Sequence, residues 1–100
     1  MATTSKVLAR TAAATTSTTL YTVPSNTTTI VTNIGITNTT ASAATASVLL
    51  NDVSLLASVA VDANSTIFVD LKQVLTATQT IKGSASTTAV NFHISGVEVA

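Results

Sequence analysis

The alternation of apolar and polar residues is clearest over residues 28–38, which read Thr-Thr-Ile-Val-Thr-Asn-Ile-Gly-Ile-Thr-Asn. Ile30, Ile34 and Ile36 occupy even positions, and the odd positions carry mostly smaller or polar residues. A period of two places the isoleucines on one face of a sheet and the other residues on the opposite face. Ile, Val and Thr are β-branched and favour a pleated strand over a helix. We therefore expect one long strand here, with the rest of the domain built against it.

The other segments with strand character are shorter and are separated by turn residues. They cover residues 19–23, 44–50, 53–61 (with a break in the middle), 66–71, 74–76, 80–86 and 90–99. Pro24 ends the first, because proline lacks an N–H donor and fixes φ. Asn51 and Asp52 form a tight-turn pair between two of the segments. The apolar phase of the last segment shifts at Gly96, which indicates a β-bulge there.

No segment shows a sustained 3.6-residue period, and turn signals recur every 8–12 residues or so, as in β-sandwiches. The pattern predicts an all-β fold, an antiparallel β-sandwich of about eight strands, of which a jelly roll is one form.

Residues 1–18 are rich in Ala, Thr and Ser and show no period. We expect them to form an extended N-terminal arm, followed by a sandwich domain over residues 19–100. The arm is also the expected partner-binding segment, with apolar anchors flanked by cations; its candidate contact residues are Lys6, Val7, Leu8 and Arg10. Packing of the arm against its own domain is the alternative.

Charge is scarce in this chain: 8 % of residues are charged, and the net charge is zero. The four cations are scattered, which argues against a nucleic-acid partner. No apolar run is long enough to span a bilayer, and the first residues lack the apolar core of a signal peptide, so no membrane partner is expected. About one residue in three is Ser or Thr. Such a surface suits a subunit that packs against neighbours, because hydroxyls are less costly to desolvate than charges; a soluble β-domain of biased composition is the alternative.

Residues capable of catalysis or metal binding are few. His93 is the single histidine, and its strand position predicts a surface residue rather than a general base. Asp52, Asp62 and Asp70 are too far apart for a calcium loop, and turn capping explains them better. Cysteine is absent, and the three glycines are isolated, so no phosphate loop is present. We therefore expect no enzyme activity, no metal and no cofactor.

Two stretches carry a family resemblance. The first comprises Lys6-Val-Leu8, a Thr/Ala linker and Thr19-Leu-Tyr-Thr-Val-Pro24, followed by the long strand; the second comprises Thr80-Ile-Lys-Gly-Ser-Ala-Ser86 and Val90-Asn-Phe-His-Ile-Ser-Gly-Val-Glu98. Over nearly its full length the chain resembles small β-rich structural proteins of tailed bacteriophages, which are frequent among phages of cyanobacteria and other aquatic bacteria. The resemblance implies a virion component assembled in the host cytoplasm, and no catalytic residues.

The first functional hypothesis is therefore a capsid cement or decoration protein that bridges major capsid subunits. We expect it to form a homo-oligomer, with a trimer favoured. A neck, tail or fibre-associated subunit is the alternative within the virion. A receptor- or glycan-binding module is the second alternative, and it would need exposed aromatic residues; Tyr21, Phe68 and Phe92 are the available ones.

Overall fold

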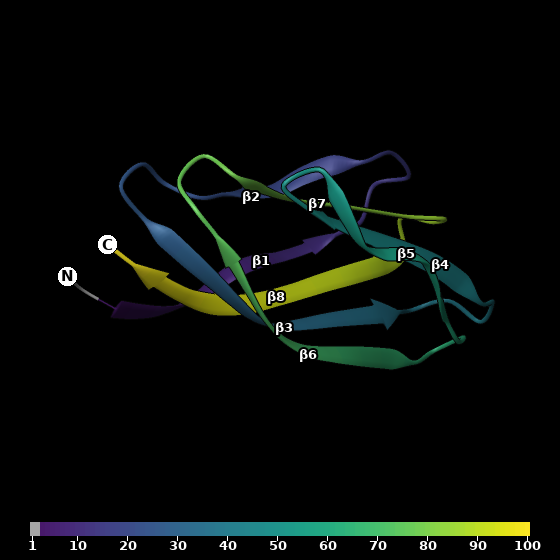
Figure 1. The fold of residues 1–100 in the computed structure, drawn as a ribbon. Coiled ribbons are helices and arrows are strands. Elements are labelled where there is room, and N and C mark those ends of the chain that lie inside the picture. Colours follow the sequence, from purple (N-terminus) through teal and green to yellow (C-terminus); the bar gives the residue numbers. More distant parts are fainter. Residues whose placement is uncertain (1–2) are drawn as a thin grey trace.

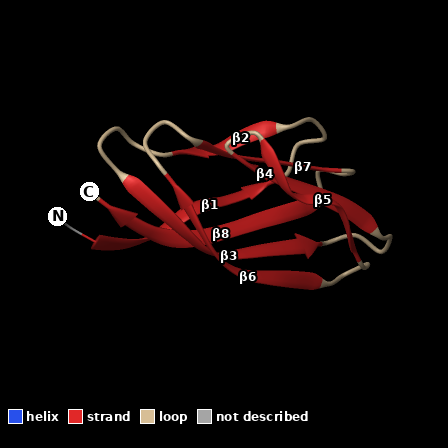
Figure 2. Ribbon diagram, in the orientation of Figure 1, coloured by secondary structure: helices blue, strands red, loops and turns tan. Residues whose placement is uncertain are grey.

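The computed structural model describes residues 3–100, and all regular structure within them is β-strand (Figures 1 and 2). The strands are β1 (Thr3–Ala12), β2 (Thr18–Thr22), β3 (Thr28–Asn38), β4 (Ala44–Leu50), β5 (Val53–Val61), β6 (Thr66–Leu75), β7 (Thr80–Ala85) and β8 (Val90–Val99). They form two four-stranded sheets, sheet A with the order β1-β8-β3-β6 and sheet B with the order β2-β7-β4-β5. Every pairing is antiparallel.

The predicted all-β antiparallel sandwich is confirmed. Consecutive strands lie in different sheets, except for the β4–β5 hairpin in sheet B, and the first and last strands, β1 and β8, are neighbours in sheet A. This strand order, with eight strands in two Greek-key halves, is that of a jelly roll. The molecule is elongated along the strands, with extents of 46 × 21 × 17 Å.

The N-terminal segment differs from the expected free arm. Thr3–Ala12 is strand β1, which pairs with β8 from Thr3↔Val99 to Ala12↔Asn91. Leu8 and Ala9 are buried in the core of the same chain. Of the two possibilities for this segment, the structure has packing on its own domain, and the sandwich begins at Thr3 rather than at residue 19. The strand was hard to find in the sequence because only two adjacent residues point to the core and no alternation results.

Strand β3 also differs in detail from the sequence expectation. Ile34 and Ile36 are fully buried as predicted, but Val31 is buried in place of Ile30. The pairing of β3 with both neighbours shifts between Val31 and Asn33. A bulge at this point reverses the side to which the preceding residues point, because side chains alternate with a period of two.

The bulge predicted at Gly96 lies instead on the strands that flank β8. Pairing of β1 with β8 shifts between Val7 and Ala9, and that of β3 shifts on either side of Thr32. Gly96 itself is buried, and a Cβ on it would lie 2.3 Å from the carbonyl oxygen of Ile30. The glycine is thus required by the close approach of β3 next to the bulge.

The remaining strands follow the sequence with one merger. The two segments expected at 66–71 and 74–76 form the single strand β6, which has an extra residue opposite the β3 bulge. The expected tight turn at Asn51 and Asp52 is confirmed, and both residues have positive φ. The segment 53–61 is not broken but forms the single strand β5, which is distorted at Ser58, whose φ is 49° and whose N–H donates to the Ser47 hydroxyl.

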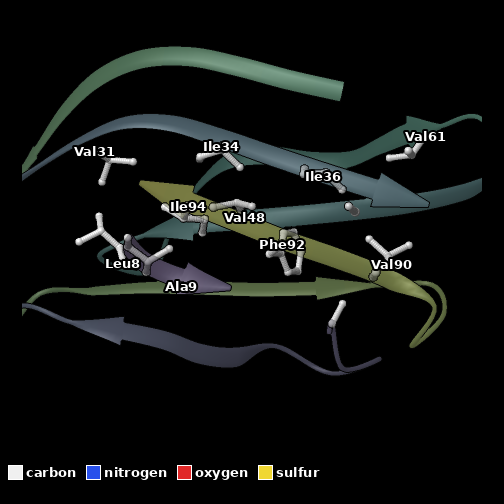
Figure 3. Close-up of a cluster of buried hydrophobic side chains, with 14 of the residues drawn as sticks. Leu8, Ala9, Val31, Ile34, Ile36, Val48, Val61, Val90, Phe92 and Ile94 are labelled. Carbon is white, nitrogen blue, oxygen red and sulfur yellow. The ribbon is translucent and has the colours of Figure 1, made fainter. Parts of the chain in front are cut away.

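The core lies between the sheets and is built mainly from aliphatic side chains around Phe92 (Figure 3). The largest fully buried apolar residues are Phe92, Ile34, Ile36, Ile81 and Ile94, with Val23, Val31, Val48, Val61 and Val90. Asn38 is buried among them, and its side chain is fully engaged: the amide nitrogen donates to the carbonyls of Ser42 and Val61, and its oxygen accepts from Thr40. This residue anchors the loop after β3 to the end of β5.

Candidate interaction surface

The outer face of sheet A carries an apolar row near the end of the sandwich where the chain termini lie (Figure 1). Val97 of β8 is paired with Ile30 of β3, and Ile30 is paired with Val74 of β6. Because paired residues point to the same side of a sheet, these side chains adjoin on the outer face. Val7 of β1, paired with Ser95, lies on the same face, immediately before the bulge in β1. We call Val7, Ile30, Val74 and Val97 the valine strip.

The valine strip is accessible to a partner. Val74 is 61 % exposed and Val7 44 %, whereas Ile30 and Val97 are half-buried. Val7 and Val74 belong to a set of only four large hydrophobic residues exposed within residues 3–100; the other two are Val53 and Phe68. Clustering of exposed apolar side chains on one face is typical of protein interaction sites.

A groove extends the valine strip around the edge of the sandwich. Its volume is about 390 Å³, and its walls come from the β4–β5 hairpin and from the end of β6. Val53, 68 % exposed, and Leu55 line it on one side, and Val74 lines it on the other. Since Val74 belongs to both the strip and the groove, the two form one continuous surface.

A polar network closes the space between the sheets at the same end of the molecule. The Tyr21 hydroxyl lies 2.9 Å from Thr29 Oγ1 and donates to the Glu98 carboxylate. Lys6 Nζ pairs with Glu98 Oε1 at 3.3 Å. Burial raises the pKa of Tyr21 above its usual 10.0, and the hydrogen bond to Glu98 adds to the rise. The hydrogen bond from Tyr21, supported by Lys6, lowers the pKa of Glu98 below its usual 4.5.

The four predicted partner-binding residues do not form one site. Val7 is exposed in the valine strip, but Leu8 is 6 % exposed and belongs to the core. Lys6 pairs with Glu98, and Arg10 is exposed on the outer face of sheet A opposite His93. Because of the bulge between Val7 and Ala9, both Leu8 and Ala9 face the core, whereas Val7 faces outward.

Three members of the valine strip were missed by the sequence analysis. Val74 was assigned to a separate short strand, so its face was undefined. Ile30 was placed in the core, because the period was read through the bulge. For Val97 the sequence does contain a signal: the apolar positions of β8 change from even to odd numbers at Gly96, which indicates that apolar residues face the other side of the sheet at this end.

The residues considered for chemistry lie apart from one another. His93 is exposed, as expected for a surface histidine. Asp52 pairs with Lys82 at 2.6 Å, and Asp70 accepts a hydrogen bond from Asn33. Within residues 3–100, His, Asp and Glu side chains nowhere gather in a group of three that could hold a metal ion. Over the same range, no helix is long and apolar enough to cross a membrane.

The fold and this surface define the class of molecule as a small jelly-roll sandwich with an exposed apolar face. No protein-family model matches the chain, and no curated protein does. Among solved structures, a pentameric capsid protein isolated from metagenomic phage sequences is similar, with 18 % identity and a TM-score of 0.43. The match covers 96 % of this chain and 59 % of the capsid protein, so this chain spans less than two thirds of that protein's length. A likeness of this degree does not transfer a function.

Proposed function

We propose that this chain is a structural protein of a phage virion, a capsid cement or decoration protein that binds across neighbouring major capsid subunits. The valine strip and its adjoining groove carry the proposal, because they offer a continuous apolar surface on an otherwise hydroxyl-rich, weakly charged domain. The family resemblance of the sequence supplies the phage context. The proposed role is structural rather than enzymatic, and the proposed location is the virion, after assembly in the host cytoplasm.

The chemistry of the surface supports a role in assembly. Valine side chains on strands are stiff, so little rotamer freedom is lost when a partner covers them. With 8 % charged residues and zero net charge, the exterior can be desolvated at low electrostatic cost. Self-association, with a trimer favoured, would place several such surfaces on one assembly and raise its avidity for a repeating shell.

The first test is the copy number of this chain in purified particles of the phage that encodes it, relative to the major capsid protein, by quantitative mass spectrometry. A number near one copy per shell subunit, or one per few subunits, is expected for a cement protein. A few copies per particle would assign the chain to the neck, tail or fibres instead. Absence from the particle would overturn both virion roles.

The second test addresses the surface itself. Val74→Ser changes an exposed member of the valine strip, and Thr45→Ser, on the exposed side of β4 in sheet B, is the matched control. Each purified variant is added to shells that lack the protein, and the bound amount is titrated. We expect Val74→Ser to weaken binding to the shell about tenfold, as for truncation of a side chain that the partner covers. Thr45→Ser should bind normally. Equal binding of the two variants would exclude the valine strip as the docking surface.

A further inference from the structure

We propose that the outer face of sheet A carries a second, separate site, centred on Phe68, that binds a saccharide. Phe68 lies in the middle of β6 and is 70 % exposed, whereas its neighbours Ile67 and Val69 pack against the core. The β3 bulge separates it from the valine strip, since Phe68 pairs with Gly35 on one side of the bulge and Val74 pairs with Ile30 on the other.

The ring has a defined seat on the sheet. A Cβ added to Gly35 would lie 2.9 Å from Phe68 Cε1 and 3.2 Å from Cδ1, so the aromatic ring occupies the space that a side chain at position 35 would need. An aromatic residue that covers a cross-strand glycine is held in place by that contact. The remainder of the ring faces solvent, and this provides a pre-positioned aromatic surface.

Hydrogen-bonding side chains flank the ring on both sides. On one side, the hydroxyls of Thr37 and Thr66 are 3.0 Å apart. On the other, Asn33 Nδ2 donates to Asp70 Oδ1 at 2.9 Å. Thr66 and Asp70 are each two residues from Phe68 along β6, which corresponds to about 6.6 Å at 3.3 Å per residue. All of these groups retain donors or acceptors beyond the bond they make to each other.

This arrangement matches the chemistry of a sugar ring. A pyranose has a face of C–H groups that can pack on an aromatic ring, and an edge of hydroxyls that both donate and accept hydrogen bonds. Phe68 would contact the C–H face, and the Asn33–Asp70 pair would bind the hydroxyls, with the carboxylate as a charge-assisted acceptor. A few polar groups converging around an apolar contact are typical of small-ligand sites.

A protein partner fits this part of the face less well. Contacts that dominate protein interfaces are surrounded by other packed residues that exclude water, but the groups next to Phe68 on its own face are polar or glycine. Nucleic acid is disfavoured as well. A phosphate backbone needs several cations, but the row of paired residues Phe68, Gly35, His93 and Arg10 contains one, and the neighbouring Asp70 is anionic.

The test is an NMR titration of the isolated chain with glucose, galactose and N-acetylglucosamine, and with the β-linked trimer of each. We expect saturable shifts of the backbone amides of Asn33, Gly35 and Asp70 with at least one of these sugars. Phe68→Leu keeps an apolar cover over Gly35 but removes the aromatic surface, and it should weaken binding about tenfold. Phe68→Trp should retain binding.

Two results would overturn the proposal: an absence of saturable shifts with every sugar, or equal binding by the wild type and Phe68→Leu. If Phe68→Leu loses the dispersed spectrum of a folded sheet, Asn33→Ala replaces it, with the same expected weakening. Because the experiment uses the isolated chain and no shell, its result is independent of the proposed cement role.

Discussion

The Tyr21 hydroxyl, on β2 of sheet B, donates a hydrogen bond to the carboxylate of Glu98, on β8 of sheet A, and this contact links the two layers. Lys6 and Thr29 complete the network. The only tyrosine of the chain therefore fixes the end of the sandwich at which both termini lie.

The network makes stability depend on pH. The pKa of Glu98 is lower in the folded chain than its usual 4.5, so the unfolded chain binds the proton first as the pH falls. The stabilisation is therefore complete above about pH 4.5 and is lost as the pH falls through the folded-state pKa. Urea unfolding from neutral pH to about pH 3 should show this decline, and Glu98→Gln should flatten it. An unchanged pH profile in Glu98→Gln would contradict the role of this residue.

Removal of the tyrosine hydroxyl tests the same link from the other sheet. Tyr21→Phe keeps the ring and should lower the free energy of unfolding by about 1.5–3 kcal/mol at neutral pH, as for a hydrogen bond to a charged group. The loss should shrink at low pH, where Glu98 is protonated. A loss that is the same at both pH values would indicate that packing, not the hydrogen bond, is affected.

The β3 bulge can be tested by two adjacent substitutions. Val31→Ala removes a fully buried side chain and should lower the free energy of unfolding by about 2 kcal/mol. Ile30→Ala, although it removes a larger side chain, lies on the outer face and should cost less. Chemical denaturation of both variants decides the register, because without the bulge the order of the two losses would be reversed.

Two glycines of sheet A should respond differently to substitution. Gly96→Ala places a Cβ 2.3 Å from the backbone oxygen of Ile30, which cannot move without disrupting β3, so a loss above about 2 kcal/mol or a failure to fold is expected. Gly35→Ala meets the ring of Phe68, an exposed side chain that can rotate away. Its cost should be small, and thermal unfolding of both variants makes the comparison. Similar losses for the two would contradict the close approach at Gly96.

Deletion of residues 1–12 should destabilise the whole domain instead of releasing an arm. It would remove β1, expose the edge of β8 and open the core at Leu8 and Ala9. We expect the free energy of unfolding to fall by at least about 3 kcal/mol, because loss of the buried Leu8 and the cavity it leaves already account for this amount. Circular dichroism and unfolding of the truncated chain measure it, and a cooperatively folded product of near-native stability would show that β1 is dispensable.

The sequence predicts the fold class well, because alternation and turn chemistry are local. The Asn51–Asp52 turn and the inward face of β8 around Phe92 could both be read from neighbouring residues, whereas the break expected within 53–61 is only a distortion at Ser58 in the continuous strand β5. The partner of Thr3–Ala12 could not, since β8 lies at the other end of the chain and the segment lacks an alternating face. The side of the sheet to which Ile30 points depends on the bulge at Thr32, and no residue type in β3 predicts that bulge.

The candidate surface was only partly predictable for the same reason. Val7 was identified as a contact residue from its apolar character, but its alignment with Val97, Ile30 and Val74 arises from cross-strand register. The grouping of Phe68 with Asn33 and Thr37 likewise exists only after β3 and β6 pair. Sequence reasoning supplied the residues, and long-range pairing determined which of them are neighbours.

The position of the last strand determines when folding can be completed. β8 lies between β1 and β3, so sheet A is divided into β1 on one side and β3 with β6 on the other until residues 90–99 are available. During synthesis residues 90–99 leave the ribosome after the other seven strands, so the two halves of the sheet cannot join until β8 has emerged. The domain therefore cannot complete its fold before β8 is available, and a premature stop within β8 would yield a product without a joined sheet.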